Sequence, residues 1–157
     1  MEAALLAAAG WLEAIGLRQW ASAGPWVYPV ANVVHVLGVV LLVGSIGILD
    51  LRVLGLWRQL PLAVLSRALV PLGIAGLLVQ FASGVVLFAA DGNALAQSGA
   101  FRLKLILMLV ALANAAAFRF VWQPGHGLRN GAIRVSALAS LVLWVAVASA
   151  GRMIAYL

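Results

Sequence analysis

The sequence contains no cysteine and little charge, and both absences narrow the classes of protein to which it can belong. Without cysteine, disulfides, thiolate metal sites and thiol catalysis are excluded. Charged residues occupy only 9% of the 157 positions, whereas a soluble domain carries roughly 25%. Because 66% of the residues are apolar, most of the surface must face lipid. The composition therefore predicts an all-α integral membrane protein, a single domain over residues 1–157.

Motifs for soluble chemistry are missing as well. The chain has no phosphate-binding loop, no nucleophile elbow and no Ser/His/Asp set outside the apolar runs. Its ten basic and four acidic residues are scattered singly rather than gathered in a patch. That distribution favours membrane orientation by basic loops over binding of nucleic acid, and it favours a protein that is not an enzyme.

Four apolar runs are long enough to cross a bilayer, which needs about 20 residues each. Asp50 is expected to end the first run, and the turn signal Asp91-Gly92-Asn93 to end the second. The Pro- and Gly-rich segment Gln123–Gly131 predicts a loop between the last two. The predicted four-helix bundle has spans at about 28–49, 69–90, 102–121 and 133–156.

The first 24 residues are too interrupted by charge to span. Glu2, Glu13 and Arg18 break the apolar stretch, and Trp11 and Trp20 suit a membrane boundary. We expect an interfacial helix that lies on the bilayer. Ala21-Ser22-Ala23 resembles a signal-peptidase site, but the segment lacks a basic start, so we expect it to be retained.

Basic residues distribute unevenly between the two sides of the predicted bundle. Six lie between spans one and two or between spans three and four, and four lie on the other side. The first group comprises Arg52, Arg58, Arg67, Arg119, Arg129 and Arg134, and the second Arg18, Arg102, Lys104 and Arg152. This bias predicts cytoplasmic arginine loops and both termini outside.

Small and polar residues recur at steps of three or four within the spans, which places them on single helical faces. For Gly73, Gly76, Gly84 and the serines, close helix packing is the favoured interpretation. The same stripes permit a homo-oligomer, since they can pack between copies as well as within one. No carboxylate falls inside a predicted span, which argues against a proton relay built on Asp or Glu.

His35 is the only histidine within a predicted span, about 10 Å deep. At that depth its N–H needs a partner, and Asn32, Gln80 or Ser83 would serve. An imidazole can also ligate haem iron or another metal. Spacing alone leaves the structural and the ligand interpretation equally open. The second histidine, His126, falls in the polar loop and is expected to be solvated.

Two cations are predicted on the same side of the membrane as His35. Lys104 and Arg152 lie near the outer ends of spans three and four, where they can snorkel or meet the propionates of haem b. Met108, one turn below Lys104, is a possible second axial ligand, although methionine is commonly plain core. The hypothesis is a haem b-binding or electron-transfer protein. Its predicted cofactor-binding residues are His35, Met108, Lys104, Arg152, Asn32 and Gln80.

Two other functions compete with haem binding. Copper handling would use His35 with Met108 or Met153, because imidazole and thioether suit Cu(I). A non-catalytic accessory subunit of a larger membrane complex fits the short loops and the six tryptophans.

A family resemblance runs through much of the chain. The segment WVYPVANVVHVLGVVLLVGSIGILDLRVLG (Trp26–Gly55) resembles an uncharacterised family of small four-span proteins of the bacterial inner membrane, and SGVVLFAAD, FRLKLILM and AGRMIAYL extend it. More distantly the chain is similar to the copper-resistance D-type membrane domain and to four-helix proteins that hold b-type haem. That relation implies fold alone. Relatives often carry a histidine where this chain has Phe118-Arg119, which weakens a two-histidine site.

Overall fold

The computed structural model is a helical bundle, and it describes residues 1–121, 130–154 and 156. Among these residues no strand is present, which confirms the all-α prediction. The elements in chain order are α1 (Glu2–Ala14), α2 (Leu17–Ser22), α3 (Val27–Leu54), α4 (Leu62–Gln97), α5 (Gly99–Val121) and α6 (Asn130–Met153). The last four are long and apolar enough to cross a membrane, by length and composition.

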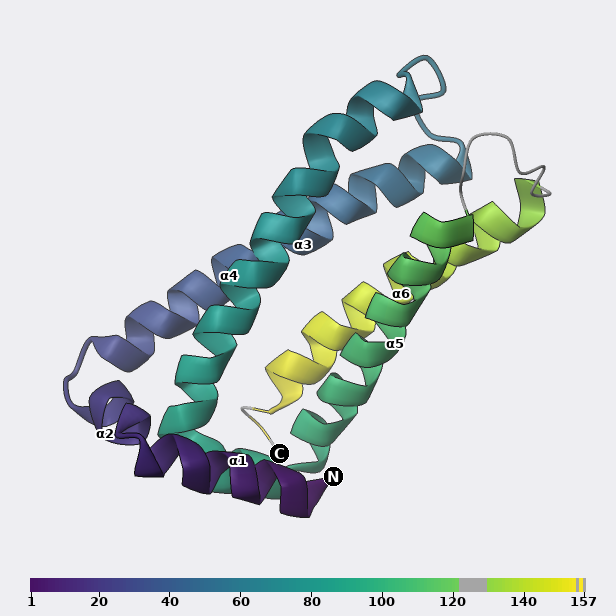
Figure 1. Ribbon diagram of the computed structural model, residues 1–157. Coiled ribbons are helices and arrows are strands. Elements are labelled where there is room, and N and C mark those ends of the chain that lie inside the picture. Colours follow the sequence, from purple (N-terminus) through teal and green to yellow (C-terminus); the bar gives the residue numbers. More distant parts are fainter. Residues whose placement is uncertain (122–129, 155, 157) are drawn as a thin grey trace.

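The four long helices pack as two pairs. α3 lies along α4 and α5 lies along α6, while α3 also contacts α6 (Figure 1). α4 and α5 make few direct contacts with each other. The N-terminus and the end of α6 lie at the same end of the bundle, and the α3–α4 connection lies at the opposite end. This topology is that of a multi-pass protein with an even number of crossings.

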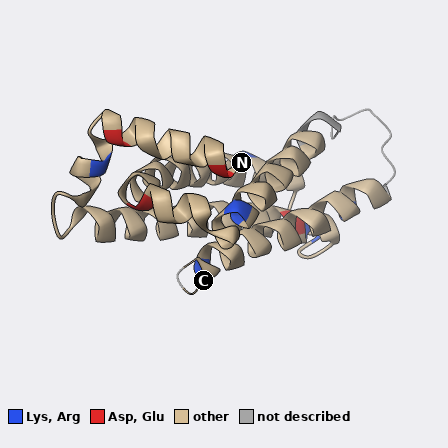
Figure 2. Ribbon diagram, turned by 90° about the horizontal axis from the view of Figure 1, so that it is seen from below, with Lys and Arg blue, Asp and Glu red and all other residues tan. Residues whose placement is uncertain are grey.

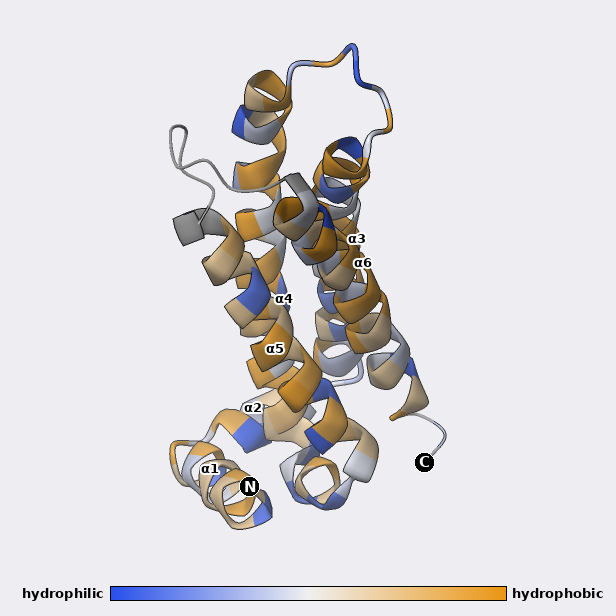
Figure 3. Ribbon diagram, turned by 90° about the vertical axis from the view of Figure 1, so that its right-hand side faces the viewer, coloured by the Kyte–Doolittle hydropathy of each residue, from blue (hydrophilic) through white to orange (hydrophobic). Residues whose placement is uncertain are grey.

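Outward-facing side chains along the long helices are mostly apolar, as a lipid environment requires. Val33 and Val40 on α3 and Phe81 on α4 are 60–70% exposed. Figure 3 shows hydrophobic residues covering these helices, and Figure 2 shows how few charges interrupt them. The bilayer is therefore the natural surrounding of this surface.

The predicted span boundaries need two corrections. α3 does not end at Asp50 but continues one turn further to Leu54, where Gly55 terminates it with φ +116°. α4 does not end at Asp91, because the chain only kinks there (φ −125°, ψ 26°) and remains helical to Gln97. Charged residues predict the first helix end and the turn signal Asp91-Gly92-Asn93 the second, but apolar residues resume after each and the helix continues through both. The predicted loop falls largely on residues 122–129, outside the described residues.

The N-terminal segment forms two helices rather than the single interfacial helix predicted. Gly16 separates them in a left-handed conformation (φ +81°), which glycine adopts without steric cost. The Glu13–Arg18 ion pair (3.0 Å) bridges this break. A second ion pair, Glu2 to Arg102 (2.6 Å), ties α1 to α5. α1 lies across the lower ends of the long helices (Figure 1), and both short helices pack on α4.

Glycines hold α3 and α4 together, as the small-residue stripes predicted. A Cβ on Gly76 would lie 2.6 Å from the Leu42 nitrogen, and a Cβ on Gly38 would lie 2.9 Å from the Gln80 nitrogen. Only hydrogen fits between backbones at this separation. The prediction of packing for Gly73 and Gly76 is thus confirmed, and the seam fixes the register of α3 on α4.

Substitution at the seam tests this register. We expect Gly76→Ala to destabilise the protein by about 3 kcal/mol, because the added methyl group meets backbone atoms that cannot move aside. Gly44→Ala is the matched control, since nothing lies within 4 Å of its Cβ position in the same bundle. Thermal unfolding in detergent should show a large loss for the first variant and a change within about 1 kcal/mol for the second. Equal losses of stability in the two variants would contradict close backbone packing of α3 against α4 at Gly76.

Candidate functional site

Residues of three helices, α3, α4 and α5, meet at His35. Its Nδ1 lies 3.0 Å from the Ser83 Oγ of α4, and its Nε2 lies 3.4 Å from the Lys104 Nζ of α5. The fourth helix, α6, contributes Gly151, whose Cβ position is 3.2 Å from the same Nζ. We call His35, Ser83 and Lys104 the imidazole centre. Its position explains Gly151, because a Cβ there would lie only 3.2 Å from the Lys104 Nζ, whereas a Cβ at Gly84 would make ordinary contact with the imidazole Cε1 at 3.4 Å.

The hydrogen bonds of Ser83 determine the tautomer of His35. The Ser83 hydroxyl donates its only proton to the Val79 carbonyl of its own helix, at 2.6 Å. Its oxygen must then accept from His35, so Nδ1 carries the ring proton. Lysine ammonium only donates, which likewise makes Nε2 the acceptor. Both neighbours therefore require the same neutral imidazole, with its lone pair on Nε2.

Lys104 has no acidic partner in the part of the chain that the structure describes. The two ion pairs found there use Glu2 and Glu13, at the N-terminal helices. The Lys104 side chain is half-buried among the long helices, and its ammonium head turns to the His35 ring instead of to solvent. A cation in this setting offers one or more donors to an anionic group.

The remaining predicted site residues lie elsewhere. Met108 packs against the apolar cluster of Leu42, Ala111, Trp144 and Val147. Arg152 donates to the Tyr156 hydroxyl, and its guanidinium stacks 4.7 Å from that ring. Asn32 is exposed on α3. Gln80 contributes its main chain to the surroundings of the imidazole, while its buried Oε1 has no hydrogen-bond partner among the described residues. His126 lies outside the described residues.

Of the expected neighbours, the structure thus brings Ser83 and Lys104 to the His35 ring. The sequence indicated Ser83 as one of three choices for a hydrogen bond. For Lys104 the sequence predicted only a depth in the membrane similar to that of His35, with haem propionates or the head-group region as its partner. It did not predict direct contact with the imidazole.

A second polar centre, around Asp50, corrects the statement that no carboxylate lies within a span. Because α3 continues to Leu54, Asp50 is inside the helix and only 7% exposed. The Ser140 hydroxyl of α6 hydrogen-bonds to its carboxyl group. Its Oδ2 has no partner among the described residues. The signal that would have placed it in the span is Gly55, a helix-terminating glycine after the apolar residues that follow Asp50.

The Asp50 carboxyl lines a small cavity of about 60 Å³ between α3, α5 and α6. Asn114 and Ser136 line it too and hold each other by reciprocal bonds, from Nδ2 to the Ser136 carbonyl (3.0 Å) and from the Ser136 hydroxyl to Oδ1 (2.9 Å). A cavity of this size has room for water beside the carboxyl group. The predicted site residues did not include this centre.

The cost of the Asp50 carboxyl can be measured. We expect Asp50→Asn to leave the stability in detergent unchanged or to raise it by about 1 kcal/mol, because the amide keeps the Ser140 contact without a charge to desolvate. Asp50→Leu, which leaves the Ser140 hydroxyl without its partner, should destabilise by about 2 kcal/mol. Thermal unfolding of both variants provides the measurement. A loss for Asp50→Asn as large as that for Asp50→Leu would show that the charge itself has a partner.

Comparison with protein-family models, with curated proteins and with solved structures finds no match to this chain. The resemblance of Trp26–Gly55 to an uncharacterised membrane family therefore stays a prediction. What the chain does has to be argued from the imidazole centre and from the membrane bundle that holds it.

Proposed function

We propose that this chain is a haem b-binding membrane protein that serves as an electron-transfer component, with His35 as the iron ligand. The observation that carries the proposal is the pair of contacts on the His35 ring, Ser83 at Nδ1 and Lys104 at Nε2, which together favour the tautomer with its lone pair on Nε2. Haem would supply the one-electron redox chemistry, and the chain would hold and orient it.

The surroundings of Nδ1 have the form that metal-binding histidines require. Such a histidine donates its other N–H to a fixed acceptor, which holds the ring orientation and raises the basicity of the ligating nitrogen. Ser83 provides this acceptor, and its own bond to Val79 keeps the hydroxyl from rotating.

Lys104 currently faces the Nε2 atom, so haem binding requires its head to move. A lysine side chain has four rotatable bonds, and the 3.4 Å contact with a neutral acceptor is long. Withdrawn by a few ångströms, the ammonium would remain in the same interior, where a propionate carboxylate could pair with it. Arg152, at the end of α6, is the second cation assigned to the propionates. Met108 packs in the apolar cluster, so the proposal assigns one iron ligand, His35.

Copper is the alternative occupant of the same nitrogen, with Met108 or Met153 as the thioether. Metal analysis and an absorption spectrum distinguish the two, because a Soret band indicates haem, whereas bound copper without a Soret band indicates copper handling. The lipid-facing surface also suits a copy of this chain or a partner in a larger complex, which would make the chain an accessory subunit. We place the protein in the bacterial inner membrane with both termini outside, in keeping with the bias of basic loops.

Replacing each histidine separately tests the haem proposal. We expect purified protein expressed with ample haem to show a Soret band that His35→Ala abolishes, because the iron loses its ligand. His126→Ala is the control, since the chain contains only two histidines. Absorption spectra of the three proteins at equal concentration provide the measurement. A colourless wild-type protein, or equal loss in both variants, would contradict the proposal.

The role of Ser83 can be tested without removing the ligand. Ser83→Ala leaves His35 in place but removes its acceptor, so we expect haem to be held 10- to 100-fold more weakly. Ser66→Ala is the matched control, because that hydroxyl bonds only to the Ala63 carbonyl on the same helix, at 3.1 Å. Haem titration followed at the Soret band gives the affinities. Unchanged affinity in Ser83→Ala would remove Ser83 from the site.

A further inference from the structure

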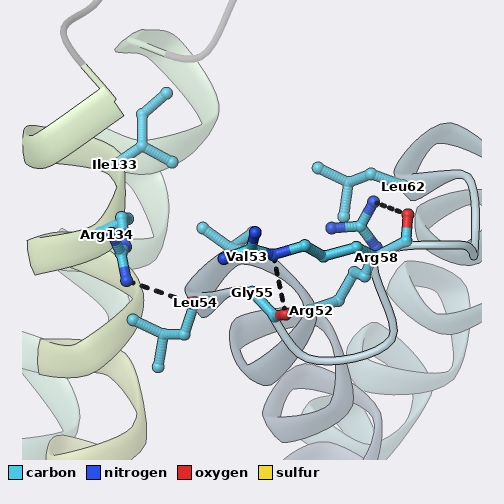
Figure 4. Close-up of a pocket in the computed structure, with 8 residues that line it drawn as sticks. All are labelled: Arg52, Val53, Leu54, Gly55, Arg58, Leu62, Ile133 and Arg134. Carbon is cyan, nitrogen blue, oxygen red and sulfur yellow. Dashed lines mark hydrogen bonds between the residues drawn. The ribbon is translucent and has the colours of Figure 1, made fainter.

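A hollow of about 470 Å³ lies at the bundle end opposite the termini, where α3 ends and α6 begins. Three arginines line it, together with apolar and main-chain groups: Arg52, Val53, Leu54, Gly55, Arg58, Leu62, Ile133 and Arg134. Figure 4 shows Arg134 on the α6 side and Arg52 and Arg58 on the side of the α3–α4 connection. We call this the arginine pocket.

Main-chain carbonyls hold each guanidinium in place. Arg52 donates from Nε to the Leu60 carbonyl (2.8 Å) and from Nη2 to the Arg58 carbonyl (3.0 Å). Arg58 donates from Nε to the Gly55 carbonyl (3.2 Å), and Arg134 donates from Nη2 to the Leu54 carbonyl (3.3 Å). The bonds to Leu54 and Gly55 cap the carbonyl end of α3, where positive charge is favourable, and those of Arg52 hold the α3–α4 connection.

The bonds to main-chain carbonyls leave several guanidinium N–H donors of the arginine pocket unused. A guanidinium has five N–H groups, and these bonds use one from Arg58 and one from Arg134. Both heads therefore retain terminal N–H groups for another acceptor. The main-chain bonds also reduce the freedom of the side chains, so less entropy is lost when a ligand binds.

No acidic side chain neutralises this charge among the described residues. Both ion pairs found there belong to the N-terminal helices at the other end of the bundle. Asp50 is the nearest carboxyl along α3, but it is buried against Ser140 and forms no ion pair with a described arginine. The arginine pocket is thus a site of net positive charge with unused donors.

The place of the pocket in the membrane identifies its ligand. It lies at one end of the long apolar helices, which is where a bundle that crosses a bilayer would meet lipid head groups and water. Leu54, Leu62 and Ile133 contribute apolar surface next to the cations. Phosphodiester oxygens are the acceptors that the guanidinium fork matches, and the acyl chains of a lipid would continue along the apolar helices. We propose that the arginine pocket binds the head group of an anionic phospholipid from the surrounding leaflet.

Lipid selectivity of the detergent-purified protein tests this proposal. We expect wild type to bind phosphatidylglycerol roughly 30-fold more tightly than phosphatidylcholine, and Arg58→Gln/Arg134→Gln to lose that preference. Arg67→Gln is the control of like charge, because Arg67 is exposed on α4 and does not line the pocket. Native mass spectrometry with the two lipids mixed in equal amounts measures the preference directly.

Several outcomes would overturn the proposal. Equal binding of the two lipids by wild type would show that the pocket does not select charge. Equal loss in Arg67→Gln would show a diffuse surface effect instead of a site. Displacement of the lipid by inorganic phosphate, but not by chloride at matched ionic strength, would assign the pocket to a soluble phosphate compound. If the glutamine variant fails to fold, Arg58→Lys/Arg134→Lys retains the charge and is expected to keep a reduced preference for phosphatidylglycerol. An undiminished preference in that variant would show that the guanidinium geometry does not contribute to binding.

Discussion

A polar nitrogen inside a bilayer must find its hydrogen-bond partner within the protein, and His35 satisfies this requirement with two different helices. Ser83 accepts from one ring nitrogen and Lys104 donates to the other. In water either contact would compete with solvent and contribute little. Inside the bundle no such competitor is at hand, so the two contacts determine the tautomer of the ring and where its lone pair points.

The imidazole centre depends in turn on how closely α3 and α4 approach. Gly38 and Gly76 bring the two backbones near enough that a methyl group would not fit between them. His35 lies about one turn from Gly38 and Ser83 about two turns from Gly76 along the same seam, which places the hydroxyl within reach of Nδ1. Larger residues at the seam would move α4 outward and leave the His35 N–H without its acceptor. The close approach of α3 and α4 therefore determines both how these helices pack and how His35 is hydrogen-bonded.

Sequence periodicity predicted the features that depend on one helix, and it failed for those that depend on two. Spans of about 20 apolar residues and glycine stripes follow from spacing alone, and the structure confirms both. The predicted end of α3 is wrong because a charged residue such as Asp50 favours a solvent-exposed helix end, whereas Asp50 is buried within the helix. Its burial depends on Ser140, nearly a hundred residues away, which no local pattern reveals. The direct contact of Lys104 with His35 was not predicted for the same reason, since depth in the membrane does not specify which way a side chain turns.

The two polar centres lie in opposite halves of the bundle, and the apolar cluster of Leu42, Ala111, Trp144 and Val147 lies between them along the helices. On α3, Leu42 falls about midway between His35 and Asp50, and on α6, Trp144 falls between Ser140 and Gly151. Within the described residues, no side-chain hydrogen bond connects the two centres across this cluster. A proton cannot cross such a layer without water, whereas electron transfer needs no continuous hydrogen-bonded chain. In the proposed function the cofactor would therefore be confined to the half of the bundle that holds His35, and the Asp50 and arginine end would lie at the opposite membrane surface.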